Sequence, residues 1–273
     1  MSAPMFRARS LAYRTDFMIH AFHGTVTERE DCVRLETPSD PDFYSGNMLL
    51  FPSRPGPGDA VRWVRRFHEE FAHAPRVRHV MLGWDDPHGS KGGVEPFLAA
   101  GFTLGENDVL TANTVHPPPR PLAGLEVRPL ESDAEWAAVV ELHLTDDEPP
   151  APLDVYVPFV HRHVGRYREL TRAGLGTWFG AFLEGRLVGD LGIFCREGVA
   201  RFQEVETHPE FRNRGVCGTM VHEVSRHALA NMGASVLVIV ADEHGPAGRI
   251  YRSVGFRNTE RQYMLNRRPV PAT

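Results

Sequence analysis

Apolar and polar residues in the second half of the chain follow the spacings of strands and helices in a definite order. Residues 125–130 alternate as a strand does, and Ser132 is placed to cap a helix that begins after it. A second helix and three strands follow, over residues 154–172, 177–183, 186–195 and 199–207. Glu184 and Gly185 predict a tight hairpin turn that makes the first two of these strands antiparallel neighbours.

An amphipathic helix and a buried strand follow the third of these strands. The apolar residues of the helix recur every three or four positions, at Cys217, Met220, Val221, Val224 and Ala228. Gly233 predicts a left-handed cap at its end. The continuous apolar run 234–241 suits a strand covered on both faces. Pro246 and Gly255 mark the start and the end of a last helix, and we expect a hairpin over 256–265 to complete the domain.

The first half of the chain repeats this order more faintly. The motif Phe-x-x-x-Gly-Phe over 97–102, which follows the apolar run 78–84, aligns with Tyr-x-x-x-Gly-Phe over 251–256. Upstream, the apolar run 47–52 and a helix over 58–73 match the preceding strand and helix. We interpret the first half as a degenerate copy of the second, and an unrelated α+β domain is the alternative.

A proline-rich stretch over 114–124 separates the two halves. Proline cannot donate to a strand ladder and favours a stiff, extended connection. The length of 273 residues also exceeds that of a typical single domain. We therefore expect a first domain over 1–115, a linker over 116–124 and a second domain over 125–273.

The turn between the strand that ends at Pro209 and the amphipathic helix combines glycine with positive charge. The start of a helix exposes backbone N–H groups, and the helix dipole favours negative charge there. Arg212 and Arg214 add positive charge at the rim, and Gly215 allows a ligand to approach the backbone closely. The pattern predicts a cradle for a pyrophosphate.

These residues resemble the GNAT superfamily of N-acetyltransferases, over the part of the chain that begins near Gly124. The family signature [Arg/Gln]-x-x-Gly-x-[Gly/Ala] is met by Arg212 and Gly215, with Cys217 in the last position, where its thiol could crowd the phosphate. The motif over 251–256 is a second family feature. The resemblance implies an α/β (α+β) fold in two tandem domains, each with a mixed, mostly antiparallel central sheet flanked by helices. The first copy lacks the arginine–glycine spacing, and we expect no cofactor site in it.

The resemblance further implies that acetyl-coenzyme A (acetyl-CoA) binds at this turn and that coenzyme A leaves as a product. The residues that would hold the pyrophosphate are Arg212, Asn213, Arg214, Gly215, Val216, Cys217, Gly218 and Thr219. Backbone groups of Val205 and Thr207 would pair with the pantetheine amides as an added strand does. His244 stands where many relatives have an Asn that contacts pantetheine, although it could equally be a loop residue.

The resemblance also assigns a base and an acid. An amine with a pKa of about 10.4 must lose a proton before it attacks a thioester. Glu204 is favoured over Glu206 as the acceptor, directly or through water, while His208 and Glu243 remain candidates and either glutamate could instead face solvent or pair with an arginine. Tyr251 matches the family's general acid, which protonates the departing thiolate; an ordinary helix tyrosine is the alternative.

Composition argues against several other classes of protein. The net charge of −5 is unlike that of a general nucleic-acid binder. The three cysteines are too widely spaced for a disulfide framework or a zinc site, which favours a cytoplasmic location. No apolar run approaches the ~20 residues that span a bilayer. The histidines of H-E-E-F-A-H, residues 68–73, do not have the H-E-x-x-H zinc spacing, and we expect no metal site.

The sequence therefore predicts an N-acetyltransferase that moves an acetyl group from acetyl-CoA to a primary amine in a ternary complex. The acceptor is a small molecule or a peptide, and the sequence does not specify it further, nor the oligomeric state. Asp146, Asp147 and Glu148 could attract a cationic amine, although a solvated acidic loop is the simpler interpretation. A non-catalytic acyl-CoA-binding or interaction module is the alternative function.

Overall fold

The computed structural model describes residues 5–145 and 152–269, which form two compact units. The first unit contains the described residues up to 109, together with 240–245 and those from 258 onward. The second unit contains the described residues of 110–239 and 246–257. The last part of the chain therefore contributes to both units. The expected linear boundaries at residues 115 and 124 stay a prediction.

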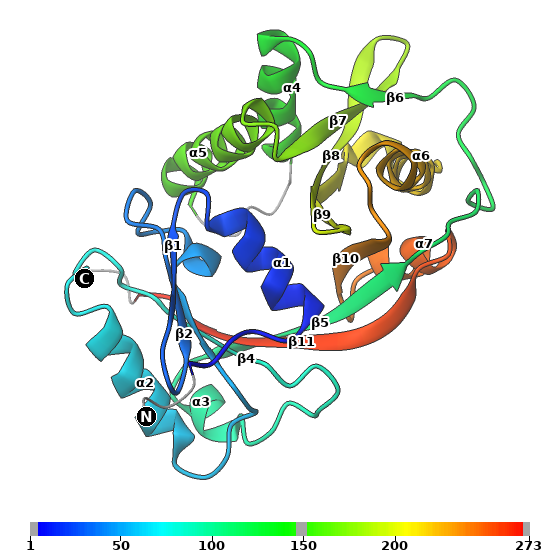
Figure 1. Ribbon diagram of the computed structural model, residues 1–273. Helices are drawn as coiled ribbons and strands as arrows, with labels where there is room; N and C mark the ends of the chain where they lie inside the picture. Colours follow the sequence, from blue (N-terminus) through cyan, green and yellow to red (C-terminus); the bar gives the residue numbers. More distant parts are fainter. Residues whose placement is uncertain (1–4, 146–151, 270–273) are drawn as a thin grey trace. The chain divides into compact units, whose positions relative to one another are not determined.

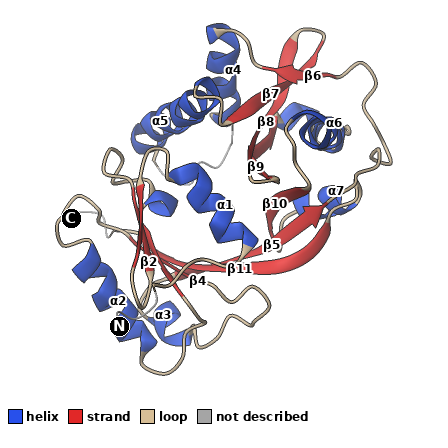
Figure 2. Cartoon of the chain, viewed as in Figure 1, coloured by secondary structure: helices blue, strands red, loops and turns tan. Residues whose placement is uncertain are grey.

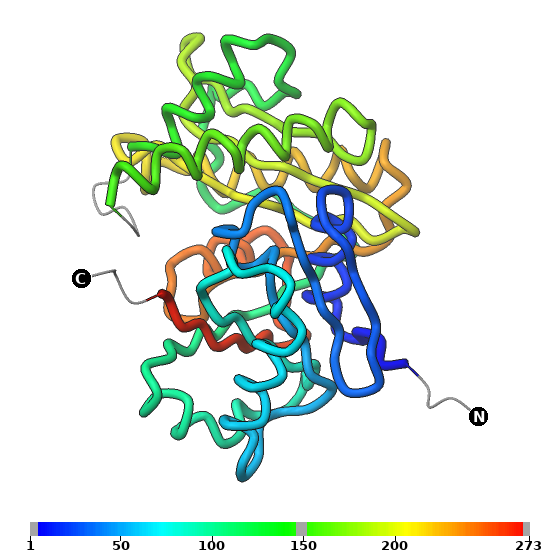
Figure 3. The backbone as a smooth tube through the Cα atoms, turned by 90° about the vertical axis from the view of Figure 1, so that its left-hand side faces the viewer, coloured from blue at the N-terminus to red at the C-terminus, as the bar shows by residue number. Residues whose placement is uncertain are grey.

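The first unit is a sheet with helices packed against it (Figure 1). Its strands lie in the order β1 (Thr25–Glu28), β2 (Val33–Glu36), β3 (Met48–Phe51), β4 (Val80–Trp84), β11 (Arg257–Arg267) and β5 (Thr103–Ala112). Its helices are α1 (Leu11–His20), α2 (Asp59–Glu70) and α3 (Glu95–Ala99), with a short 3-10 turn, η1 (Tyr44–Gly46). β1 and β2 form an antiparallel hairpin, blue in Figure 3, whereas β3 and β4 are parallel and are joined by α2. Trp63 of α2 stacks on Phe51 of β3 in the core, with ring centroids 4.1 Å apart.

The second unit has the same kind of architecture (Figure 2). Its strands lie in the order β10 (Val236–Asp242), β9 (Val199–Thr207), β8 (Arg186–Arg196), β7 (Gly176–Leu183) and β6 (Glu126–Pro129). Its helices are α4 (Asp133–His143), α5 (Leu153–Arg172), α6 (Val216–Asn231) and α7 (Ala247–Arg252), with the 3-10 turn η2 (Pro209–Phe211). β9 and β10 are parallel and are joined by α6, and the other paired strands are antiparallel. α4 and α5 cover one face of these strands and α6 covers the other. The mixed, mostly antiparallel sheet flanked by helices is confirmed.

Short sequence signals set the element ends in the second unit. Ser132 and Glu135 form a reciprocal capping box at the start of α4. Glu184 and Gly185, between β7 and β8, both have positive φ angles, of 52° and 80°, as a tight hairpin turn requires. Gly233 follows α6 with a φ of 68°, the left-handed cap predicted for it.

The internal repeat is confirmed at the level of single hydrogen bonds. In the first unit, the N–H of Phe102 donates to the carbonyl of Phe97 across the end of α3, at 3.0 Å. In the second, the N–H of Phe256 donates to the carbonyl of Tyr251 across the end of α7, at 3.2 Å. Each helix end contains a glycine with positive φ, so both copies of the motif close a short helix in the same way.

The predicted final hairpin over 256–265 is wrong. Residues 257–265 belong to a single strand, β11. It lies between β4 and β5 in the first unit and pairs antiparallel with β4. Tyr263 and Leu265 of β11 are buried on one side of it, and Tyr263 stacks on Trp84 with ring centroids 5.5 Å apart. A turn within this stretch would remove these alternating side chains from the core.

Candidate active site

β9 has an open edge along its second half. Its parallel pairing with β10 ends at Arg201, opposite Val238. Beyond Arg201, within the described part of the second unit, β9 continues to Thr207 without this partner. Unpaired backbone groups on such an edge can bind an extended ligand as an added strand would.

A β-bulge bends β9 within this open stretch. Between two cross-strand pairs, Glu206 with Asp190 and Gln203 with Gly192, β9 carries one residue more than β8. Glu204 lies in the bulge with a φ of 45°, which side chains other than glycine seldom adopt. A regularly alternating strand would place Glu204 and Glu206 on the same face, and the bulge between Gln203 and Glu206 interrupts that alternation.

Two side chains of α5 hold the carboxylate of Glu204. His163 Nε2 lies 3.1 Å from Glu204 Oε1, and the hydroxyl of Tyr167 lies 3.4 Å from the same oxygen. Burial acts to raise the pKa of Glu204, but the hydrogen bond and charge of His163, together with the charge of His143, outweigh it and hold the pKa at about 2. Glu204 is therefore an ionised carboxylate in a fixed position, with 39% of its side chain exposed.

Glu206 lies at the end of the open edge, and its carboxylate contacts neighbouring groups of the protein. Its Oε1 accepts the backbone N–H of Thr207 at 3.0 Å and is 3.4 Å from a terminal nitrogen of Arg212. Arg212 also donates from Nε to the carbonyl of Thr207, at 3.2 Å. Both backbone groups of Thr207, which were expected to face pantetheine, thus have partners within the protein.

Tyr251 lies on α7 and Cys217 on α6, two helices that pack together, and the charge of Glu206 acts on both side chains. Tyr251 is only 4% exposed, and burial, with smaller contributions from Cys217 and Glu206, raises the pKa of its phenol well above the usual value. Burial, with Glu206 adding to it, raises the pKa of the Cys217 thiol to about 12. Both groups are therefore protonated at neutral pH, and the phenol has a proton to give.

The predicted cradle is a helix start with a left-handed glycine before it. α6 begins at Val216, after Gly215 with a φ of 91°. The first N–H groups of a helix have no acceptor within it, so they are available to an anion. The guanidinium of Arg214 lies 5.0 Å over the ring of Phe211, at the rim of this turn, and that of Arg212 is turned toward β9. Asn213 also has a positive φ, of 63°.

Comparisons with known proteins give the fold. A family model described as FR47-like protein matches residues 180–265. A GCN5-related N-acetyltransferase from Kribbella flavida is 17% identical, with a TM-score of 0.63 over 97% of this chain and 98% of its own. A tandem GNAT protein from the clavulanic acid biosynthesis pathway is 15% identical, with a TM-score of 0.54 over 97% of this chain and 91% of its own. The chain has a tandem GNAT fold.

A structure of unknown function from Staphylococcus epidermidis also has this GNAT fold over most of its length, with 14% identity and a TM-score of 0.71 over 90% of this chain and 95% of its own. A search of curated proteins finds no match to the sequence. The FR47-like match runs from β7 to β11 and so includes the bulge, the cradle and Tyr251. Fold and family match together support an acyltransferase type of function.

The GNAT fold also brings together residues that the sequence analysis did not select. Asp190 of β8 is fully buried, and both its oxygens lie 3.2 Å from Nε2 of His143, at the end of α4. Trp178 donates its indole N–H to Asp190 at 2.8 Å. Burial acts to lower the pKa of His143, but the charge and hydrogen bond of Asp190 raise it to about 9. A lone aspartate in the otherwise apolar β8 was the available signal.

The remaining predicted residues make contacts of their own or lie outside the described part. His244 follows β10 in the first unit, where its N–H donates to Asp242. Glu243 pairs with Arg261 in the same unit. His208 accepts the N–H of Glu210 at 3.3 Å in the turn after β9. The acidic stretch 146–148 lies outside the described residues.

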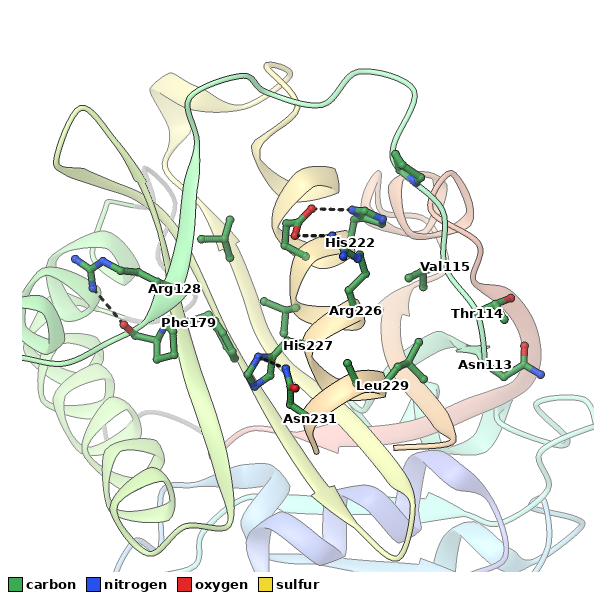
Figure 4. A pocket seen from close by; sticks show the side chains of 16 residues that line it. Asn113, Thr114, Val115, Arg128, Phe179, His222, Arg226, His227, Leu229 and Asn231 are labelled. Carbon is green, nitrogen blue, oxygen red and sulfur yellow. Dashed lines mark hydrogen bonds and ion pairs between the residues drawn. The ribbon is translucent and has the colours of Figure 1, made fainter. Parts of the chain in front are cut away.

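A separate open cavity of about 910 Å³ is lined by α6, β6, Phe179 of β7 and the linker (Figure 4). His222, Arg226 and Asn231 of α6 line it, with Arg128 on β6 and Thr114 on the preceding linker. It contains none of the predicted catalytic residues. In the described part of the GNAT fold no helix is long and apolar enough to cross a membrane, and no group of three metal-ligating side chains is found.

Proposed function

We propose that this protein transfers an acetyl group from acetyl-CoA directly to a primary amine, with both substrates bound together. The observation that carries the proposal is the open edge of β9, which leads to Glu206 just before the turn into α6, with the buried phenol of Tyr251 in the same unit. An acid and a carboxylate beside an unpaired strand edge are what aminolysis of a thioester needs.

The residues of the chain fit acetyl-CoA on chemical grounds. The amide groups at the start of α6 and the guanidinium of Arg214 would meet the pyrophosphate. The open edge of β9 would take the pantetheine arm. Cys217 contributes a neutral thiol, so it adds no repulsive charge to the cradle.

The chemical step follows from the positions of the two titrating groups. The neutral amine attacks the thioester carbon, a C–N bond forms and the C–S bond breaks. The sulfur takes the phenolic proton of Tyr251. The amine nitrogen loses a proton to Glu206 through water, and this proton then passes to the phenolate of Tyr251, so both residues end in their starting state. Acetyl amide and free coenzyme A result, with no net oxidation. Holding both reactants aligned can contribute roughly 7–11 kcal/mol of barrier reduction.

We assign the base to Glu206 and an anchoring role to Glu204. His163 and Tyr167 hold the pKa of Glu204 low, so this carboxylate is a weaker proton acceptor than an ordinary glutamate. Glu204, held by His163 and Tyr167, suits a fixed negative charge that attracts the amine. Glu206 is the carboxylate whose charge reaches Tyr251 and Cys217.

Steady-state thiol release with acetyl-CoA and a panel of amines tests this assignment. Glu206→Gln and Tyr251→Phe should each lower kcat by about 10²–10⁴-fold. Glu204→Gln changes size and charge in the same way as Glu206→Gln. It should raise KM for the amine and leave kcat within a few-fold of the unmodified protein. Loss of kcat in Glu204→Gln alone would return the base to Glu204. Binding of acetyl-CoA without turnover of any amine would favour the non-catalytic module.

A further inference from the structure

The proline-rich linker packs on the helices of the second unit. We call residues 114–122 the strap. Four of them, at positions 117, 118, 119 and 121, are prolines, which have no N–H and a fixed φ. Two of the remaining N–H groups donate hydrogen bonds: that of His116 to the segment just after α7, and that of Leu122 to α6. A stiff segment loses little conformational entropy when it is ordered in this way.

The first half of the strap is fixed to α7. The N–H of His116 donates to the carbonyl of Val254, just after α7, at 3.1 Å. A Cβ on Gly218 would lie 3.1 Å from the side chain of Pro118 and 3.5 Å from Ile250, so the strap, α6 and α7 meet there. Gly218 was expected to serve the cofactor, and its missing side chain serves this contact as well.

The second half of the strap is fixed to the turn before α6. The hydroxyl of Thr219 donates to the carbonyl of Gly215 at 2.9 Å and accepts the N–H of Leu122 at 2.9 Å. A Cβ on Gly215 would lie 2.3 Å from the carbonyl oxygen of Arg120, closer than real contacts allow. Glycine at 215 is therefore required by the strap as well as by its φ of 91°.

We propose that the strap is a positioning element of the cofactor site: it clamps the Gly215 turn so that the first amides of α6 are aligned for phosphate before binding. This inference rests on the proposed function. The hydroxyl of Thr219 is the centre of the clamp, because it joins the turn and the strap through one oxygen. A preorganised turn has less freedom to lose when a ligand binds, which increases affinity without any added contact.

Thr219→Val removes the hydroxyl and retains the shape of the side chain. Its matched control is Thr171→Val, because the hydroxyl of Thr171 also donates to the carbonyl four residues earlier, at 2.9 Å, on α5 and away from the strap. Calorimetric titration with coenzyme A should give a Kd about tenfold higher for Thr219→Val and an unchanged Kd for Thr171→Val. Leu122→Pro removes the same bond from the strap side and should have the same effect as Thr219→Val.

The kinetic signature separates positioning from general loss of stability. Thr219→Val should raise KM for acetyl-CoA about tenfold and leave kcat nearly unchanged, whereas a general loss of folded protein would lower kcat. Equal coenzyme A affinity in Thr219→Val and the unmodified protein would overturn the inference. Tighter binding in Thr219→Val would overturn it as well, since the strap would then obstruct the cradle. If the unmodified protein binds no coenzyme A, the proposed function itself fails, and the inference falls with it.

Discussion

The buried pair of His143 and Asp190 should make the stability of the protein depend on pH in a defined window. The pKa of His143 is raised from 6.5 to about 9. A raised pKa in the folded state contributes stability that is fully present below about pH 6.5 and is lost as the pH rises through about 9. At about 1.36 kcal/mol per pKa unit, the difference corresponds to about 3 kcal/mol.

Asp190→Asn removes the negative charge and retains the shape of the side chain. The imidazolium then lacks its partner, so we expect a loss of about 3 kcal/mol in the free energy of unfolding at pH 6. The loss should shrink steadily as the pH rises toward 9, where about half of His143 in the unmodified protein has lost its proton, and should vanish above that pH. Asp133→Asn is the matched control, because Asp133 pairs with Arg168 at the surface with 88% of its side chain exposed. Its effect should stay within about 1 kcal/mol at every pH.

Urea unfolding followed by tryptophan fluorescence at pH 6, 7.5 and 9 measures these differences, and Trp178 beside Asp190 reports on the local structure. The informative quantity is the difference between Asp190→Asn and the unmodified protein at each pH, since other groups titrate in both. A difference of the same size at pH 6 and pH 9 would refute the reasoning. Asp190 would then act through its hydrogen bonds alone and not through the charge on His143.

Two further predictions concern the fold. Ser132→Ala removes half of the capping box at α4 and should lower the free energy of unfolding by about 1 kcal/mol, with unchanged thiol-release kinetics. Leu265→Ala leaves a cavity at a fully buried position of β11 and should cost about 2–5 kcal/mol, measured by urea unfolding. A cost below about 1 kcal/mol for Leu265→Ala would mean that β11 does not complete the core of the first unit.

The sequence predicted those parts of the fold that depend on neighbouring residues. The capping box at Ser132, the hairpin turn at Glu184 and the left-handed cap at Gly233 each need only a few residues in a fixed order. The same holds for the repeated Gly-Phe helix ends. β11 could not be placed in this way, because its partner β4 lies far away along the chain and no local signal specifies that pairing.

The same difference between local signals and long-range pairing applies to the candidate site. The turn with Gly215 was found from its residues and the helix tyrosine Tyr251 from the family resemblance, and the roles of both stay predictions. The bulge at Glu204 was missed, since it arises from the pairing of β8 with β9 and not from a residue type. His163 and His143 reach the site region from helices, and their distance along the chain from Glu204 hid their part in lowering its pKa.

The place of β11 between β4 and β5 has a consequence for how this protein is made. A ribosome delivers β11 only after all the strands of the second unit, so the sheet of the first unit cannot close until those strands have been made. A gene cut at the proline-rich connection would yield a first fragment with two unprotected strand edges, which tend to pair with other chains and aggregate. Adding a peptide of Arg257–Arg267, the residues of β11, should restore the solubility of such a fragment.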